Sequence, residues 1–259
     1  MAYGSRATTP SEPASRRTST LLDRLLDYLA SFQVPHNYFT HFYILSISCS
    51  LFWGWQQWDF ALKSRAAYMA WIFMLIQGSR RFLESYYFTS QSKSNMWLGH
   101  HILGLIFYLT INVAVWIEEH ASSGHWIPLH SFPPQKEPRV FSWKLDVLPA
   151  VILGFHGLQH LYHAYLYRLR TDNEGYQMPE FPVFPGLLCP HYTCETIIYL
   201  LLSFLAAPKG ETVNWTLLSA TVFVAVNLGV TAVGTREWYL QRFGEEKMRG
   251  KKRMIPWVW

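Results

Sequence analysis

The chain of 259 residues is 50% hydrophobic and 17% aromatic, and only 15% of its residues are charged, against about 25% in an ordinary soluble domain. This composition excludes an ordinary soluble domain and indicates an integral membrane protein with polar loops. Three scattered cysteines exclude a disulfide framework and a zinc-ribbon spacing, so we expect reduced thiols. No Gly-x-Gly-x-x-Gly pattern occurs, which excludes dinucleotide binding in the Rossmann manner.

The N-terminal segment differs in composition from the rest. Its first 20 residues hold three arginines among Ser, Thr and Pro but no apolar stretch, so they form neither a signal peptide nor a span. Leucines then recur at helical spacing from Leu21 to Leu29 with charged residues opposite, which predicts an amphipathic helix lying on the membrane. We interpret residues 1–35 as a cytosolic leader with this helix, and residues 36–259 as one membrane-embedded domain.

Six apolar segments follow, and together they predict an all-α fold, a multi-span helical bundle in the membrane. Aromatic residues flank the first segment as interfacial belts would, with Tyr43 at one end and Trp55 at the other. The polar segments 118–143 and 171–188 are expected to be loops. The expected spans are residues 38–58, 66–87, 96–117, 145–167, 192–207 and 213–239.

Basic residues indicate the orientation of the bundle. Lys93, Arg168 and Arg170 lie on the same side as the basic leader and the basic tail, which predicts that both termini are cytosolic. Such residues set topology or bind anionic lipid in most membrane proteins. The alternative is that they bind the phosphates of a nucleotide cofactor.

Polar side chains inside the predicted spans concentrate toward the cytosolic ends. A charged group in the membrane centre costs about 2.5–3.5 kcal/mol on insertion scales unless a partner offsets it, so each is a site hypothesis. Arg81 and Glu84 are three residues apart, share a helical face and can form an ion pair. The side chains concerned are Arg80, Arg81, Glu84, Gln159, His163, His191, Glu195 and Asn227.

Two interpretations of this concentration remain open. The polar groups line a cavity that holds a polar head group beside an oily tail, or they only form hydrogen bonds between helices, worth ~0.6 kcal/mol each. Eight such groups on one side favour the cavity. His156, His160 and His163 share a helical face and admit a metal site, but His-x-x-His-His clusters are missing and we expect no metal.

Several short motifs, spread over residues 35 to 259, together carry a resemblance to a known family. They are Tyr38-Phe39-Thr40-His41-Phe42-Tyr43, Ser79-Arg80-Arg81-Phe82-Leu83-Glu84, Gln159 with His163 before Leu169-Arg170, Pro190-His191-Tyr192 with Glu195, Asn227 with Ala232, and Trp238-Tyr239 before Ile255-Pro256. The chain resembles the steroid 5α-reductase superfamily, in particular the short, fungal-like forms of its polyprenal (polyprenol) reductase branch. Family members generally have seven spans, whereas we expect six here, and Arg236 stands where relatives have His.

The resemblance implies an NADPH-dependent reductase of the endoplasmic reticulum membrane. Such an enzyme saturates the α-isoprene unit of a long polyprenyl lipid on the route to dolichol and so supports protein N-glycosylation. The implied partners are this lipid and the bilayer, with no nucleic acid, and the oligomeric state stays open. Carried over position by position, the cofactor contacts are Gln159, His163, Arg170, His191, Glu195, Asn227, Tyr239, Lys251 and Arg253.

The reduction itself needs a hydrogen-bond donor at the substrate carbonyl. Hydride addition to the β-carbon of an unsaturated aldehyde moves negative charge onto the carbonyl oxygen, and a donor in a water-poor site stabilises it. The Tyr of the steroid branch falls at Gly78 or Ser79 here, and its Gln-Glu pair is missing. We therefore expect Glu84 with Arg81 to act at the carbonyl, with Tyr87 or its neighbour Tyr86 as the alternative donor.

Two other functions are weighed against the reductase. Isoprenylcysteine-type membrane methyltransferases, which use S-adenosylmethionine, have a similar C-terminal pattern, which Arg236-Glu237, Phe243-Gly244-Glu245-Glu246 and Ile255-Pro256 match here. A lipid-binding membrane protein without enzymatic activity is the other alternative. The motifs in the first four spans favour the reductase.

Overall fold

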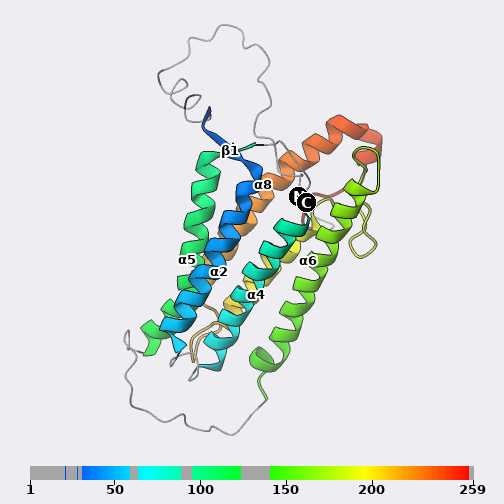
Figure 1. Ribbon diagram of the computed structural model, residues 1–259. Coiled ribbons are helices and arrows are strands. Elements are labelled where there is room, and N and C mark those ends of the chain that lie inside the picture. The colour runs from blue at the N-terminus through cyan, green and yellow to red at the C-terminus, as the bar shows by residue number, and fades with distance from the viewer. Residues whose placement is uncertain are drawn as a thin grey trace.

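The computed structural model describes residues 31–58, 64–88, 95–123 and 141–256, together with positions 21 and 28. Most of the predicted leader helix therefore lies outside the described residues. The described part forms an elongated bundle of six long helices (Figure 1). The helices are α2 (Phe39–Gln56), α4 (Arg65–Tyr87), α5 (Leu98–Ser123), α6 (Leu148–Thr171), α7 (Pro190–Leu205) and α8 (Trp215–Met248).

Each predicted apolar segment overlaps one of these helices, so the all-α prediction is confirmed, but the predicted ends of α5 and α8 are too early by several residues. Helix α5 continues to Ser123 instead of ending at 117, because Glu118 accepts hydrogen bonds from the backbone N–H groups of Trp215 (3.0 Å) and Thr216 and so stays packed against the start of α8. Helix α8 continues past 239 to Met248, interrupted at Gly244, whose φ of 81° and ψ of 168° suit glycine.

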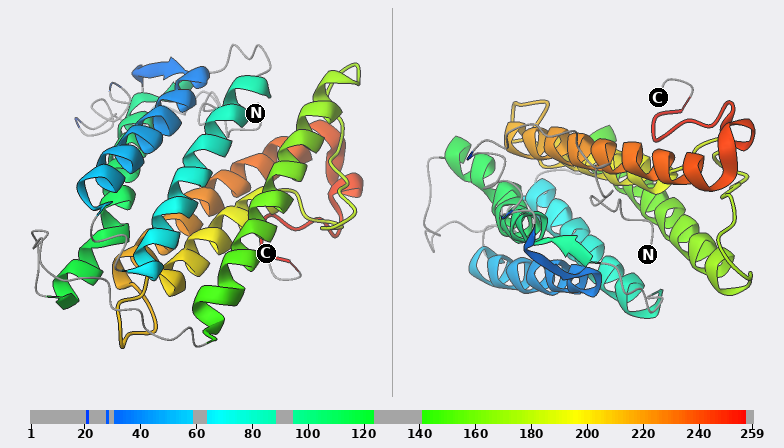
Figure 2. Two further views of the ribbon diagram at one scale, coloured as in Figure 1. Left: turned by 60° about the horizontal axis from the view of Figure 1, so that its bottom comes forward. Right: turned by 90° about the horizontal axis from the view of Figure 1, so that it is seen from above.

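The helices pack in two groups that share one core. Helix α2 packs against α4 and α5, and α7 lies against both α6 and α8 (Figure 2). Between the groups, α4 contacts α7 and α5 contacts α8. The largest apolar cluster fills the space between the groups. Its fully buried members include Ile152, Ile198, Leu202, Leu205 and Leu217.

The outer surface of the bundle is apolar over long stretches. Leu51, Ile106, Val226 and Val230 are each about half exposed or more, a pattern that marks a surface in contact with lipid or another apolar partner. Among the described residues, Leu98–Ser122 and Trp215–Met248 are long and apolar enough to cross a membrane. These two helices and the apolar exterior support the interpretation of the chain as a membrane protein.

Two short strands and two irregular helical turns were not predicted. Strand β1 (Gln33–Pro35) pairs antiparallel with β2 (Asn95–Trp97) and joins the starts of α2 and α5. A 3-10 turn, η1 (His36–Tyr38), leads into α2, and a π-helical turn, η2 (Trp143–Val147), leads into α6. Three-residue strands are too short to show a period of two in the sequence.

The C-terminal segment returns to the start of α7. The backbone N–H of Leu188 donates to the carbonyl of Lys252 and that of Cys189 to the carbonyl of Arg253, both at 2.9 Å, while Lys252 N–H donates to Gly186 at 2.8 Å. The Thr193 side chain also donates to the carbonyl of Met254. Residues 252–254 therefore hold the first turn of α7 in place.

Close contact between α2 and α4 yields a stability prediction. A Cβ at Gly54 would lie 2.3 Å from a ring carbon of Trp71, and the Trp71 indole donates to the Ser50 carbonyl at 2.8 Å. Gly54→Ala is expected to lower the unfolding free energy by about 1–3 kcal/mol because the buried indole must move. Gly154→Ala, with nothing within 4 Å of the added Cβ, serves as control in thermal unfolding in detergent and should keep or raise stability. Equal melting temperatures for both variants would contradict this packing.

Candidate active site

Polar side chains from α2, α4, α6 and α7 meet inside the bundle, in the half where α4 and α6 end and α7 begins. Glu84 is 2% exposed, and Gln77, Gln159 and His163 are equally buried. We call this set the polar network. Its members are Tyr43, Gln77, Arg80, Arg81, Glu84, Gln159, His160, His163, His191 and Glu195.

Glu84 lies at the centre of one half of the polar network. Its carboxylate accepts from Arg80 Nη1 at 2.6 Å and from Arg81 Nη1 at 2.7 Å, because residues three and four positions apart face the same side of a helix. From α6, His163 Nδ1 lies 2.7 Å and His160 Nδ1 3.0 Å from the same carboxylate. A buried carboxylate persists only with such partners, and the predicted Arg81–Glu84 pair is present.

Glu195 is the centre of the other half. Its Oε1 accepts from Gln77 Nε2 at 2.7 Å, and its Oε2 accepts from Gln159 Nε2. Arg80 connects the two halves, since its Nη2 donates to Gln77 Oε1 at 2.6 Å and to Gln159 Oε1. One guanidinium therefore joins two carboxylates, and through them α4, α6 and α7.

Helix α2 joins the polar network through Tyr43. Arg81 Nη2 donates to the Tyr43 hydroxyl at 2.8 Å, and the guanidinium lies 5.1 Å from the centre of the ring. Tyr43 is only 3% exposed, so its assignment to an interfacial aromatic belt is wrong. A buried guanidinium requires acceptors, and the phenol provides one.

The three histidines of α6 do not act together. His160 and His163 face Glu84, whereas His156 stacks on Phe73 with 6.2 Å between ring centres. Within the described ranges, no group of three or more His, Cys, Asp or Glu side chains is arranged to hold a metal ion. His191 lies at the edge of the polar network, with its carbonyl 3.3 Å from Gln159 Nε2 and its ring against that of His163.

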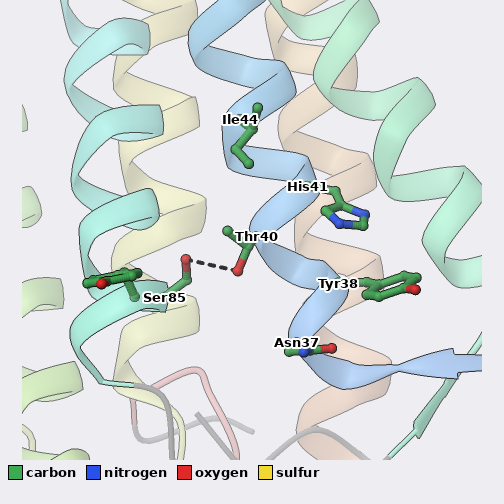
Figure 3. A pocket seen from close by; sticks show the side chains of 7 residues that line it. Asn37, Tyr38, Thr40, His41, Ile44 and Ser85 are labelled. Carbon is green, nitrogen blue, oxygen red and sulfur yellow. Dashed lines mark hydrogen bonds between the residues drawn. The ribbon is translucent and has the colours of Figure 1, made fainter.

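Tyr87, the predicted alternative donor, lies outside the polar network. It is the last residue of α4 and is 66% exposed, and its neighbour Tyr86 is 70% exposed. Tyr86 lines an open surface pocket of about 460 Å³. Figure 3 shows Thr40 and Ser85 facing each other there, with 3.4 Å between their hydroxyl oxygens. The residues that line it are Asn37, Tyr38, Thr40, His41, Ile44, Ser85 and Tyr86.

That pocket contains no member of the polar network. Its closest polar pair, the hydroxyls of Thr40 and Ser85, is uncharged and only part-buried. It lies between the start of α2 and the end of α4 (Figure 3). The buried charges and amides of the polar network are therefore the stronger candidate for chemistry.

The predicted cofactor residues near the end of α6 form a second cluster. The Arg170 guanidinium lies 4.3 Å from the centre of the Tyr176 ring, and that of Arg242 lies 4.8 Å from the same ring and 5.6 Å from Trp238. Lys251 pairs with Glu180 at 3.0 Å. Arg170 and Arg242, which both stack on the Tyr176 ring, form a basic surface beside the loop after α6.

The remaining predicted cofactor residues are dispersed. Tyr239 is 1% exposed in an apolar cluster with Met248 and Met254. Arg253 contributes its carbonyl to the contact with α7, and Asn227 is half-buried in α8, where its carbonyl accepts from Thr231 at 3.0 Å.

Sequence reasoning overlooked Gln77, counted Arg80 among the polar groups of the cavity without giving it a specific role, and considered His160 only as a possible metal ligand. Gln77 lies three residues before Arg80 and seven before Glu84, a spacing that places all three on one face of α4. That spacing is the signal that would have found it. Because the Gln77 side chain is neutral, its burial costs too little free energy for hydropathy to single it out.

Several buried atoms of the polar network have no hydrogen-bond partner in the part of the chain that the structure describes. They are Arg80 Nε, His163 Nε2 and His191 Nδ1. Buried polar atoms are bonded in the great majority of cases, so such a group of atoms indicates a place for a ligand. Two imidazoles and a guanidinium offer both donors and an acceptor.

Comparison with known proteins adds a family to this geometry. The family model described as 3-oxo-5-alpha-steroid 4-dehydrogenase matches residues 134–259. Over these residues the chain is similar to the steroid 5α-reductase superfamily, and the relatives described below are polyprenal reductases. Within the superfamily match lie α6, α7 and α8 with Gln159, His163 and Glu195, whereas α4 with Glu84 precedes it.

Three relatives illustrate the similarity. Polyprenal reductase 1 of Oryza sativa subsp. indica is 40% identical over 99 residues, 37% of this chain and 26% of that protein. Polyprenal reductase 1 of Arabidopsis thaliana is 26% identical over 256 residues, 82% of this chain and 78% of that protein. Polyprenal reductase of Saccharomyces cerevisiae is 25% identical over 237 residues, 90% of this chain and 78% of that protein. The alignment with the rice protein thus covers about a quarter of its length.

The central ion pairs yield a prediction for Glu84→Gln. Removing the carboxylate leaves Arg80 and Arg81 as buried charges that Glu195 alone does not balance. The loss of one partner from a buried pair typically costs about 3–5 kcal/mol. The measurement is thermal or denaturant unfolding of the purified protein in detergent.

Two further variants test the origin of this loss. Arg65→Gln removes the exposed pair with Asp146, 3.3 Å apart and 43% exposed at Arg65, and should cost at most about 1 kcal/mol. The double variant Arg81→Gln with Glu84→Gln should be more stable than the sum of the single changes predicts. Strict additivity would show that the two side chains are not coupled.

Proposed function

We propose that the protein is a polyprenal reductase, which uses NADPH to reduce the C=C bond of the α-isoprene unit on the route to dolichol, and thereby supports protein N-glycosylation. The observation that carries the proposal is the buried polar network with its unpartnered Arg80, His163 and His191 atoms. The polyprenal reductase relatives supply the substrate class. Polyprenol is the alternative form of the same lipid.

The residues of the polar network fit NADPH as cofactor. Arg80 Nε, His163 Nε2 and His191 Nδ1 suit the carboxamide and ribose groups, and Gln159 and Glu195 lie beside them. The Arg170–Arg242 cluster offers basic groups for phosphates. NADPH, when bound, supplies a hydride for the β-carbon of the substrate. The other predicted contacts, Asn227, Tyr239, Lys251 and Arg253, are kept as part of this proposal.

Arg81 and Glu84 have different roles in the proposed reaction. Reduction moves negative charge onto the aldehyde oxygen, and a guanidinium stabilises that charge best where water is excluded. Glu84 accepts from both arginines and lies against two histidines, so it orients Arg81 and His163. We therefore assign charge stabilisation to Arg81 and positioning to Glu84.

The proposed setting is the endoplasmic reticulum membrane, with six spanning helices, both termini in the cytosol and residues 36–259 as one domain. Helix α7, with 16 residues, measures about 24 Å at 1.5 Å per residue, shorter than a hydrocarbon core of about 30 Å. Its polar first turn then lies within reach of the cytosolic leaflet. The long polyprenyl chain would occupy the apolar side of the site and the bilayer.

A substrate panel tests the proposed function. Purified protein in lipid nanodiscs receives NADPH with polyprenal, polyprenol or a 3-oxo-4-ene steroid, and product is identified by mass spectrometry. We expect the product from polyprenal to be two mass units heavier than the substrate. Glu195→Gln should lower the rate of product formation at least 100-fold, because both amides that contact this carboxylate lose their charged acceptor.

The same panel distinguishes the alternative functions. Methyl transfer from S-adenosylmethionine to an isoprenylcysteine, without NADPH oxidation, would replace the reductase by the methyltransferase. The absence of both reactions would favour a lipid-binding protein.

The basic cluster after α6 yields a prediction on cofactor choice. If Arg170 binds the 2′-phosphate, Arg170→Ala should raise the KM for NADPH about 10- to 100-fold and leave the KM for NADH unchanged, since a hydrogen bond to a charged group contributes about 1.5–3 kcal/mol. Arg168→Ala, an exposed arginine two residues earlier, is the matched control. Equal effects on the two cofactors would remove Arg170 from the phosphate site.

A further inference from the structure

Tyr199 carries a buried hydroxyl that nothing in the described part of the chain contacts by a hydrogen bond. The residue is 0% exposed, and its OH has no partner among the described residues. Buried tyrosine hydroxyls usually find a partner. Tyr199 lies on α7 four residues after Glu195, which is about one helical turn. The unpartnered phenol is therefore one turn away from the polar network.

The surroundings of Tyr199 change from polar to apolar across the ring. On the polar side, Glu195 lies one helical turn before Tyr199 on α7, and its carboxylate accepts from Gln77 and Gln159. The ring belongs to the main apolar cluster and meets the edge of Phe107 with 5.7 Å between ring centres. Tyr199 thus lies at the boundary between the charged groups and the part of the core that suits an isoprene unit.

We propose that Tyr199 is the proton donor to the α-carbon in the reduction, an inference that rests on the proposed function. NADPH, when bound, would supply the hydride for the new C–H bond at the β-carbon and would be oxidised to NADP⁺. As the C=C π bond breaks, the Tyr199 proton forms the new C–H bond at the α-carbon, and the aldehyde becomes saturated at these two carbons. The Tyr199 phenolate then recovers a proton from solvent when the product leaves.

The carboxylates, the arginines and Tyr43 of the polar network suit this step less well. The two carboxylates are hydrogen-bond acceptors of arginines and amides, and a guanidinium does not release its proton in proteins. The Tyr43 hydroxyl already accepts from Arg81 and lies on the charged side. A phenol has an ordinary pKa of about 10 and can give a proton to an enolate carbon.

Tyr199→Phe tests the assignment with three measurements. The melting temperature of the variant should equal or exceed that of the parent protein, because the change removes a buried polar atom without a partner. NADPH binding, measured by fluorescence without substrate, should change less than twofold. The kcat for polyprenal should fall at least 100-fold, in the range of general acid catalysis.

Isotope labelling separates proton donation from a structural role. The reaction is run in D₂O, and the aldehyde product is trapped at once with borohydride. The product of the parent protein should carry one deuterium at the α-carbon, in a single configuration. Tyr199→Phe should give both configurations in its slow residual product, because solvent then delivers the deuteron from either face. Tyr162→Phe is the matched control, since that buried hydroxyl donates to the Leu188 carbonyl at 2.9 Å. The control should lose stability and keep a single configuration.

The outcomes distinguish this inference from the proposed function. If the parent protein reduces polyprenal and Tyr199→Phe keeps its rate and its single configuration, Tyr199 is not the donor. A lower melting temperature with unchanged configuration would assign Tyr199 a structural role and overturn the inference. If the parent protein reduces no polyprenal at all, the proposed function fails and this inference fails with it.

Discussion

The burial of Glu84 is the constraint on which the rest of the structure depends. A carboxylate that is 2% exposed loses the solvation that water would give it, and only close partners offset that loss. Two arginines come from its own helix and two histidines from α6. Because Arg80 also binds the amides that contact Glu195, the positions of α4, α6 and α7 along their axes are fixed together. A slip of one turn in any of them would leave a buried charge without a partner.

This arrangement separates two tasks within one bundle. The charged groups balance one another, with two arginines and two carboxylates. The site therefore carries no large net charge whose burial would lower the stability of the folded state. The apolar cluster next to it is continuous with the core between the two helix groups. Helix α7 belongs to both regions, with Glu195 among the polar groups and Tyr199 among the apolar ones. The proposed polyprenyl substrate, with a reactive head group and a long hydrocarbon tail, would use both environments.

The sequence predicted the helices and part of the site for separate physical reasons. Apolar runs of helical length have no other stable form in a membrane, so the six helices followed from hydropathy. The Arg81–Glu84 pair followed from a spacing of three residues. Whether one helix contacts another was not predictable in this way. The extension of α5 depends on Glu118 and the first backbone groups of α8, which are about 100 residues apart.

Side-chain direction accounts for the remaining differences within the site. Tyr43 and Tyr87 both lie near helix ends and have aromatic neighbours in the sequence. The sequence around an exposed tyrosine of an interfacial belt looks the same as the sequence around a buried hydrogen-bond donor. The structure buries Tyr43 against Arg81 and exposes Tyr87. Gln77 escaped notice because a neutral amide costs little in a hydropathy argument, although it contacts both Arg80 and Glu195. Such roles depend on packing between helices, which no single segment encodes.

The contact between residues 252–254 and the start of α7 ties the candidate site to a segment about 60 residues further along the chain. The backbone N–H groups of Leu188 and Cys189 donate to the carbonyls of Lys252 and Arg253, directly before the helix that carries His191 and Glu195. A change that separates residues 252–254 from this turn would therefore disturb the polar network without altering any of its members.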